Sequence, residues 1–244
     1  MIVLVLRNQL RACMYLNLGS FAIMDHTVEC KRTANMIERS PAFRNKGKPI
    51  ATGLRKFGEK IMDAGNSLQV MYRKASYVFE TFQTEVQVML DRLELQFPDK
   101  SEFFRDRINK MVKVVSEFRE KVVKAKESIL DAENHRHGLE GDILDGLREA
   151  EKYIDGGDGH AVDLRRAQVE LESTNSILNH LHNTANSLDV MIKVLREYEG
   201  NLLEVDSKLD DIFLVTKDDF NYLIKSLNDL HNTHKRFMRQ DNRS

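Results

Sequence analysis

Tryptophan is absent from this chain of 244 residues, and proline occurs only three times. Charged residues make up 31% of the sequence and hydrophobic residues 41%. This balance suits long amphipathic helices with solvated outer faces, because proline would interrupt them and charge keeps the outer faces in water. The composition therefore predicts an all-α protein, and it argues against both a disordered chain and a β-sandwich.

Cysteine is also scarce, with only Cys13 and Cys30. The sequence has no CxxC motif, and no Cys/His spacing suits zinc. Both cysteines precede the region in which we expect the helical bundle, so that region contains no disulfide. This pattern fits a reducing compartment, and we expect a cytoplasmic protein, peripheral at a membrane in one alternative.

Long uncharged apolar runs are missing as well. Residues 1–24 are the most apolar part, yet their longest uncharged run, Ala12 to Met24, has 13 residues, and a membrane-spanning helix needs about 20. An uncharged start and the interruptions at Arg7 and Arg11 argue against a cleaved signal peptide. Two alternatives remain for 1–24. It is an interfacial helix with Arg7 and Arg11 on its polar side, or it is a helix or strand packed on the bundle or a poorly ordered leader.

The net charge of −1 gives no global attraction to nucleic acid, but the charge is unevenly spread. Residues 1–60 contain 11 Lys/Arg and 4 Asp/Glu, whereas residues 61–244 contain 26 and 34. A basic N-terminal part is a candidate contact for anionic lipid, nucleic acid or an acidic partner. The alternatives are a solvated tail, or an arm that folds back onto its own acidic body.

Within this basic part, Arg44, Lys46 and Lys48 surround a glycine. With Arg7 and Arg11 they form our candidate set for contact with a membrane or an anionic partner. The run has no interleaved aromatic residues and no fold signature for nucleic acid, so no nucleic-acid partner is expected. Two prolines disfavour helix at the residues before them. We therefore interpret 25–50 as a linker, and 1–50 as an apolar, then basic, N-terminal arm and linker.

The strongest pattern in the sequence begins at Phe104. Apolar residues recur at alternating steps of four and three, which places them along one side of an α-helix at about 3.5 residues per turn. A helix from Phe104 to Ile154 would be roughly 75 Å long. The pattern comprises Phe104, Ile108, Met111, Val115, Phe118, Val122, Ala125, Ile129 and Ala132, crosses Arg136, and resumes at Leu139, Ile143, Leu147, Ala150 and Ile154.

Two further segments carry the same pattern, which we call a seam. The first seam comprises Leu54, Phe57, Ile61, Ala64, Leu68, Met71, Ala75, Val78, Phe82, Val86, Met89, Leu93 and Phe97. The other comprises Leu164, Ala167, Leu171, Thr174, Leu178, Leu181, Ala185, Leu188, Ile192, Leu195, Tyr198, Leu202, Val205, Leu209 and Ile212. We predict helices at about 52–97, 101–155, 161–213 and 217–238. Glycines favour a break near 134–142, since each costs about 1 kcal/mol in a helix interior.

These elements predict an elongated antiparallel helical bundle or coiled coil over 51–240, with three long helices and a shorter C-terminal helix. The connections between the long helices are short, which makes sequential helices antiparallel neighbours. Large apolar side chains in the seams should dominate stability, at roughly 1.5–3 kcal/mol for each one fully buried.

No reaction signature is present. Six of the eight histidines fall in three pairs: His135/His137, His180/His182 and His231/His234. In the first two pairs the residues are two apart, which on a helix separates them by about 200°, so they cannot bind one metal ion together. His231 and His234 share a helix face, yet no third ligand is marked. The glycine-rich run after Asp155 follows no strand and lacks the residues of a phosphate loop. We therefore predict no catalytic, cofactor-binding or metal-binding residues, no cofactor, and no enzymatic activity.

Two functions remain. The first is a non-enzymatic structural or protein-interaction bundle, acting as a scaffold with a protein partner or through self-association as a homo-oligomer. The second is a membrane-associating helical module, of the membrane-remodelling or pore-forming type, that uses the apolar N-terminal segment on an anionic membrane surface.

Overall fold

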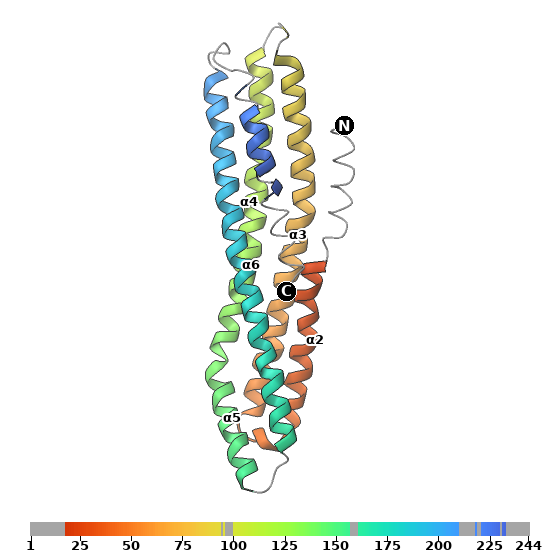
Figure 1. Ribbon diagram of the computed structural model, residues 1–244, viewed down its shortest axis with the longest axis vertical. Helices are drawn as coiled ribbons and strands as arrows, with labels where there is room; N and C mark the ends of the chain where they lie inside the picture. The colour runs from red at the N-terminus through yellow and green to blue at the C-terminus, as the bar shows by residue number, and fades with distance from the viewer. Residues whose placement is uncertain are drawn as a thin grey trace. The chain divides into compact units, whose positions relative to one another are not determined.

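The computed structural model describes residues 18–93, 95, 100–156, 161–209, 218, 221–229, 231 and 232. Its helices are α2 (Leu18–Arg39), α3 (Gly47–Leu93), α4 (Lys100–Gly138), α5 (Glu140–Asp155) and α6 (Ala161–Lys208), with a short 3₁₀ helix, η1 (Pro41–Phe43), between α2 and α3 (Figure 1). Residues 221–229 are also helical, and the described part of the chain contains no strand. The predicted all-α helical bundle is confirmed.

The described residues divide into two compact units. Unit 1 comprises the described residues of Gln69–Lys124 and Ser187–Arg243, and unit 2 those of Asn17–Leu68 and Ala125–Asn186. The division falls within α3, α4 and α6, so each of these helices contributes to both units.

The predicted seams form the cores of the units. On α4, every seam position from Phe104 to Ala132 is buried, and on α3 so is every position from Leu54 to Met89. On α6 the seam is buried from Ala167 to Val205, and Leu209 just after the helix is buried too. The exception is Leu178, which is only half-buried, whereas its neighbour Ile177 is buried. Burial of these apolar side chains is the main source of stability, as the periodic pattern predicts.

In unit 1, the contacts between α3 and α4 show that the two helices are antiparallel. Lys74 Nζ lies 2.9 Å from Glu117 Oε2, and further along α3 Glu85 Oε2 lies 2.9 Å from Arg107 Nη1. Residue numbers rise on α3 as they fall on α4. Antiparallel packing is therefore confirmed in this unit.

In unit 2, α3 and α4 are antiparallel as well. His135 Nε2 lies 3.2 Å from the carbonyl oxygen of Gly53, while Lys60 Nζ lies 2.7 Å from Asp131 Oδ2. These contacts place the start of α3 against the end of α4.

The interpretation of 25–50 as a linker was wrong, because α2 occupies Leu18–Arg39 and its inner face is part of the core of unit 2. Thr27, Cys30, Ala34 and Ile37 are each no more than 3% exposed, and they follow steps of three and four. The seam signal was present, but its threonine and cysteine made it less apolar than the other seams. Residues 18–50 therefore belong to the bundle rather than to a separate arm.

Helix α3 begins at Gly47, before the predicted start near 52, and it includes Pro49. Proline is tolerated in the first helical turn, where the backbone N–H has no partner inside the helix. The proline before it, Pro41, starts η1, and Ser40 ahead of it is extended (φ −78°, ψ 124°), as expected for a residue before proline.

Only one residue, Leu139, separates the end of α4 from the start of α5. It lies inside the 134–142 segment where the sequence predicts a break. Leu139 N–H bonds to Arg136 O at 3.1 Å, so the turn tightens there by one residue. The Leu139 side chain packs over Gly53 of α3, where a Cβ would lie 2.0 Å from Leu139 Cδ2. The absence of a side chain at Gly53 therefore permits this close approach.

The ends of the predicted helices beyond α3 and α6 lie in part outside the described residues, and so does part of the predicted 217–238 helix. None of the described helices is both long enough and apolar enough to cross a membrane.

Candidate functional site

The structure describes three of the five basic residues predicted to contact a membrane or an anionic partner. Arg44 and Lys48 are exposed, and Lys46 is half-buried. Arg7 and Arg11 lie outside the described residues. The three described residues flank the start of α3 and belong to unit 2.

Lys46 faces acidic side chains of α5. Its Nζ lies 2.9 Å from Asp142 Oδ1 and 3.4 Å from Asp145 Oδ2. The hydrogen bond to Asp142, together with the charge of that carboxylate, raises the pKa of the Lys46 ammonium group. Such exposed ion pairs contribute little to stability, but they direct this charge towards the protein itself.

A second acidic residue of α5 fixes the start of α3. Glu149 Oε1 accepts hydrogen bonds from the backbone N–H of Asn45 at 2.8 Å and from its side-chain amide at 2.6 Å, and Oε2 accepts from the N–H of Lys46 at 3.0 Å. These groups precede the first turn of α3, where the helix dipole favours negative charge. The sequence gives no sign of this contact, since 104 residues separate Asn45 from Glu149.

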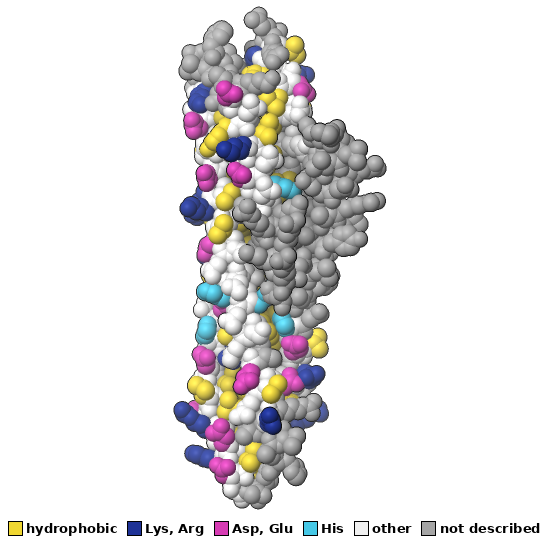
Figure 2. Space-filling model, in the orientation of Figure 1, with side chains coloured by type: hydrophobic (Ala, Val, Ile, Leu, Met, Phe, Trp, Pro, Cys, Tyr) yellow, Lys and Arg dark blue, Asp and Glu magenta, His cyan; other side chains and the backbone are white. Residues whose placement is uncertain are grey.

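Basic and acidic side chains pair elsewhere in unit 2 as well. Arg32 of α2 hydrogen-bonds to Glu170 of α6, and Lys60 of α3 pairs with Asp131 of α4. With Lys46, these pairs favour the alternative in which the basic N-terminal part folds back onto the acidic body of the chain. On the face drawn in Figure 2, Lys and Arg side chains are accordingly interspersed with Asp and Glu.

The most unusual group of unit 2 is Arg136 of α4, which is 2% exposed and occupies a seam position. Its Nε donates a hydrogen bond to Thr174 Oγ1 at 3.0 Å, and its Nη2 donates to Asn175 Oδ1 at 3.0 Å. Thr174, also buried, donates its own proton to Leu171 O at 2.6 Å. Arg136 Nη1 is buried and makes no hydrogen bond with any described residue. Arg136, Thr174 and Asn175 are named the Arg136 cluster below.

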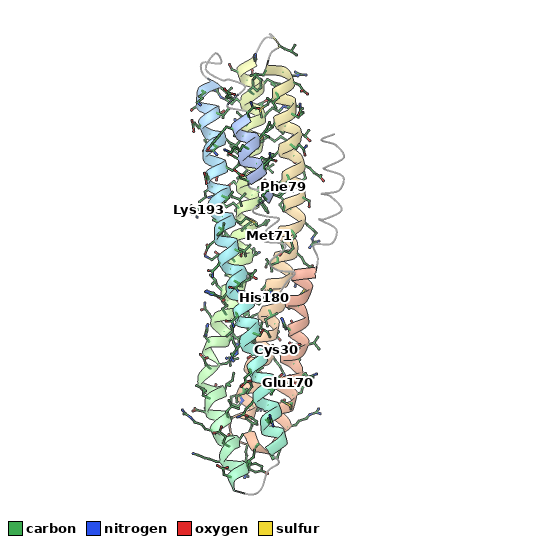
Figure 3. The ribbon with its side chains drawn as sticks, in the orientation of Figure 1. Cys30, Met71, Phe79, Glu170, His180 and Lys193 are labelled. Atoms are coloured by element: carbon green, nitrogen blue, oxygen red, sulfur yellow. The ribbon has the colours of Figure 1, made fainter. Side chains whose placement is uncertain are left out.

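Among the described residues, the groups that hydrogen-bond to the Arg136 guanidinium are all neutral. Burial lowers the pKa of this guanidinium, while Glu140 and Cys30 oppose the shift; an arginine nevertheless stays charged in proteins. Cys30, a free thiol of α2 marked in Figure 3, is 0% exposed. Burial raises the pKa of Cys30 to about 12, and Arg136 offsets this only in part. At neutral pH the thiol is therefore uncharged.

A second polar contact joins α4 and α6 in unit 2. Glu133 is 8% exposed, and its Oε1 lies 3.6 Å from Nδ1 of His182. Burial raises the pKa of the Glu133 carboxyl, and the nearby His182 and His137 lower it by less. Glu133 is thus a buried acid without full compensation for its charge.

Unit 1 contains a buried acid whose charge, unlike that of Glu133, is compensated by neighbouring cations. Glu85 of α3 is 3% exposed and lies within hydrogen-bonding distance of Arg107 and Lys110 of α4, at 2.9 Å and 2.5 Å. Burial alone would raise the pKa of Glu85, but the hydrogen bonds from the two cations outweigh it and lower the pKa. This satisfied network joins α3 to α4.

Tyr198 of α6 lies in the core of the same unit, 1% exposed. Its ring stacks on Phe82 of α3 with centroids 5.2 Å apart and an interplanar angle of 27°. Its hydroxyl oxygen is buried and bonds to none of the described residues.

The predicted histidine pairs do not converge on a metal site in the part of the chain that is described. His135 contacts the backbone of α3, His182 contacts Glu133, and the ring of His231 packs edge-on against Phe79 at 5.0 Å. His234 lies outside the described residues. Among the residues described, no group of three or more His, Cys, Asp or Glu side chains could hold a metal ion.

An open depression in unit 1 lies where α6 approaches the 221–229 helix. It is lined by Asn201, Glu204, Val205, Lys208, Asp218 and Tyr222. Its lining includes both acidic and basic side chains. Lys208 Nζ and Glu204 Oε1 lie 3.5 Å apart and form an ion pair. The arrangement offers no nucleophile with an adjacent base.

Comparison with known proteins adds no further constraint. The chain matches no protein-family model, no curated protein and no solved structure.

Sequence reasoning did not single out the Arg136 cluster, although a signal existed. Arg136 interrupts the apolar seam of α4, and Thr174 interrupts the seam of α6. Two polar residues at seam positions of antiparallel helices indicate a buried polar contact, provided that the register between the helices is known. That register comes from the structure.

Proposed function

We propose that the chain is a non-enzymatic, cytoplasmic scaffold, a coiled-coil type of helical bundle that binds other proteins through its outer helix faces, including a second copy of itself. One observation carries the proposal. The long helices bury their seams against one another within a single chain, and large apolar side chains remain exposed on the outside. The free thiol of Cys30 supports a reducing location.

The exposed pair Val70 and Tyr77 on α3 is the surface to test first. They are 44% and 50% exposed, and a spacing of seven places them on one helix face. Single exposed apolar residues are ordinary, but two on one face are suited to packing against a partner helix.

The experiment is size-exclusion chromatography with light scattering on the full chain at micromolar concentrations. The expected mass exceeds the monomer mass of 28.3 kDa, and the double variant Val70→Ser/Tyr77→Ser shifts the population towards monomer. Leu144→Ser, at a similarly exposed position of α5, is the matched control and leaves the mass unchanged. A strict monomer throughout this range rules out self-association.

A membrane-associating module is the second candidate, supported by the exposure of Arg44 and Lys48 next to η1. Because α2 is part of the core of unit 2, deleting residues 1–50 would damage the fold and would not test this idea. Charge removal by Arg44→Ser/Lys48→Ser is the better perturbation. If full chain and variant alike stay in the supernatant with anionic liposomes at low salt, membrane association is excluded.

A further inference from the structure

The Arg136 cluster carries a positive charge that unit 2 does not balance at close range. We propose that Arg136 anchors an internal binding site for one small monovalent anion of the halide class, which is chloride under ordinary conditions. The anion accepts hydrogen bonds from Arg136 Nη1 and from the side-chain amide of Asn175. This inference is independent of the proposed scaffold function.

The first argument is energetic. A fully buried ion without a partner is costly to the folded state even after the protein relaxes. Arg136 is 2% exposed, and its two acceptors, Thr174 Oγ1 and Asn175 Oδ1, are neutral. Its Nη1 is buried and finds no acceptor in the described part of the chain. Hydrogen bonds to neutral oxygens at two of the three nitrogens leave the net charge uncompensated.

The second argument is that no nearby acid pairs directly with Arg136, although the charge of Glu140 acts on the guanidinium from beyond hydrogen-bonding distance. Cys30 stays a neutral thiol at neutral pH, because burial raises its pKa to about 12. Glu133 faces His182, and Glu170 accepts from Arg32 and Thr33. The fourth candidate, Glu140, has a side chain that is 57% exposed and lies 3.9 Å from His137. None of the four forms an ion pair with the guanidinium.

The third argument concerns the size and charge of the ligand. The N–H groups of Nη1 point into protein rather than into solvent, so the anion loses its hydration shell on binding. A singly charged halide is easier to desolvate than sulfate or phosphate, which carry more charge and need more room. Asn175 is exposed on α6, so the cluster lies one side chain away from water, which gives a small ion a short route in.

The test measures unfolding of the full chain in urea in sodium chloride and in sodium gluconate of equal ionic strength. Gluconate is too bulky for a buried site. An anion that binds only the folded state lowers the unfolding equilibrium constant by a factor of 1 + [L]/Kd, about tenfold at a concentration of about ten times Kd. The expected result is a wild-type midpoint that rises with chloride and does not rise with gluconate.

Two variants separate the site from general salt effects. Asn175→Asp places a carboxylate where Asn175 Oδ1 now accepts from Arg136, so the internal charge replaces the anion and the chloride dependence disappears. The change lies at an exposed position, which protects the fold. Arg119→Met is the matched control: this arginine of unit 1 is partly buried but already pairs with Glu199 at 3.3 Å. The control variant keeps the full chloride dependence.

Bromide gives the direct readout, since anomalous scattering from crystals grown in bromide should show a peak within hydrogen-bonding distance of Arg136 Nη1. Equal wild-type midpoints in chloride and gluconate overturn the proposal and leave solvent water as the partner of Nη1. Chloride dependence that survives in Asn175→Asp overturns it as well.

Discussion

Replacing Tyr198 by phenylalanine should stabilise the protein. The substitution keeps the aromatic ring that stacks on Phe82 and removes only the hydroxyl, which is buried and bonds to none of the described residues. A buried polar group left without a partner costs about 1–3 kcal/mol. The expected gain in the free energy of unfolding is therefore about 1–3 kcal/mol near neutral pH.

The same hydroxyl makes a second, pH-dependent prediction. Burial raises the pKa of Tyr198 in the folded state, whereas in the unfolded chain it is about 10. Below that pH both states hold the proton and the contribution is constant. Above it, only the unfolded state releases the proton, so stability falls by about 1.4 kcal/mol per pH unit until the folded pKa is reached. Tyr198→Phe removes this loss, so its advantage over wild type grows at alkaline pH.

Urea unfolding followed by far-ultraviolet circular dichroism measures both effects, near neutral pH and above pH 10. Tyr222→Phe is the control, because Tyr222 is 50% exposed and loss of a solvated hydroxyl changes stability by no more than about 0.5 kcal/mol. The reasoning is refuted if Tyr198→Phe is less stable than wild type by more than about 0.5 kcal/mol, since its hydroxyl must then have a hydrogen-bond partner.

Two further predictions use pairs of like residues in unlike surroundings. Gly146→Ala should lose about 1–3 kcal/mol by overpacking, because a Cβ there would lie 2.4 Å from the buried Cδ1 of Ile50. Gly200→Ala, in the interior of α6 with open space around it, should gain about 1 kcal/mol, and thermal unfolding of both variants decides. Glu85→Gln should lose about 1–3 kcal/mol at neutral pH, because its charge-assisted hydrogen bonds are removed, and the deficit shrinks as the pH falls through the lowered pKa of Glu85. Glu133→Gln should instead gain stability at neutral pH, since the pKa of Glu133 is raised, and its gain vanishes below about pH 4.3. A urea titration across the acid range measures both, and equal pH profiles for the two variants contradict the assigned directions.

The helical cores follow from the sequence because burial in a bundle depends on periodicity. A seam at steps of three and four must face a neighbour, whatever that neighbour is, so the burial of Phe104 and Phe118 needs no knowledge of the partner helix. The prediction failed at α2, where the seam contains Thr27 and Cys30 and two prolines follow. Proline ends a helix only when it stands beyond the first turn, and Pro49 stands within the first turn of α3.

The candidate site was harder to predict because it depends on pairs that are far apart in the sequence. Glu149 binds the backbone before α3, and Lys46 pairs with Asp142, but their spacing on the chain has no period to detect. The excess of positive charge in the N-terminal part and of negative charge in the rest indicates that such ion pairs can form, but not which residues form them. It left open whether Lys46 faces an external anion or the chain itself, and the described contacts favour the chain.

Arg136 shows why a seam pattern can predict burial correctly and still leave the chemistry open. Position 136 follows Ala132 by four residues and precedes Leu139 by three, so the helix buries whatever side chain stands there. An apolar residue would continue the seam and would generally be at least as stable as a buried charge. The guanidinium is therefore not explained by the stability of the bundle alone. The anion that we propose at Arg136 and Asn175 would account for the charge at this position.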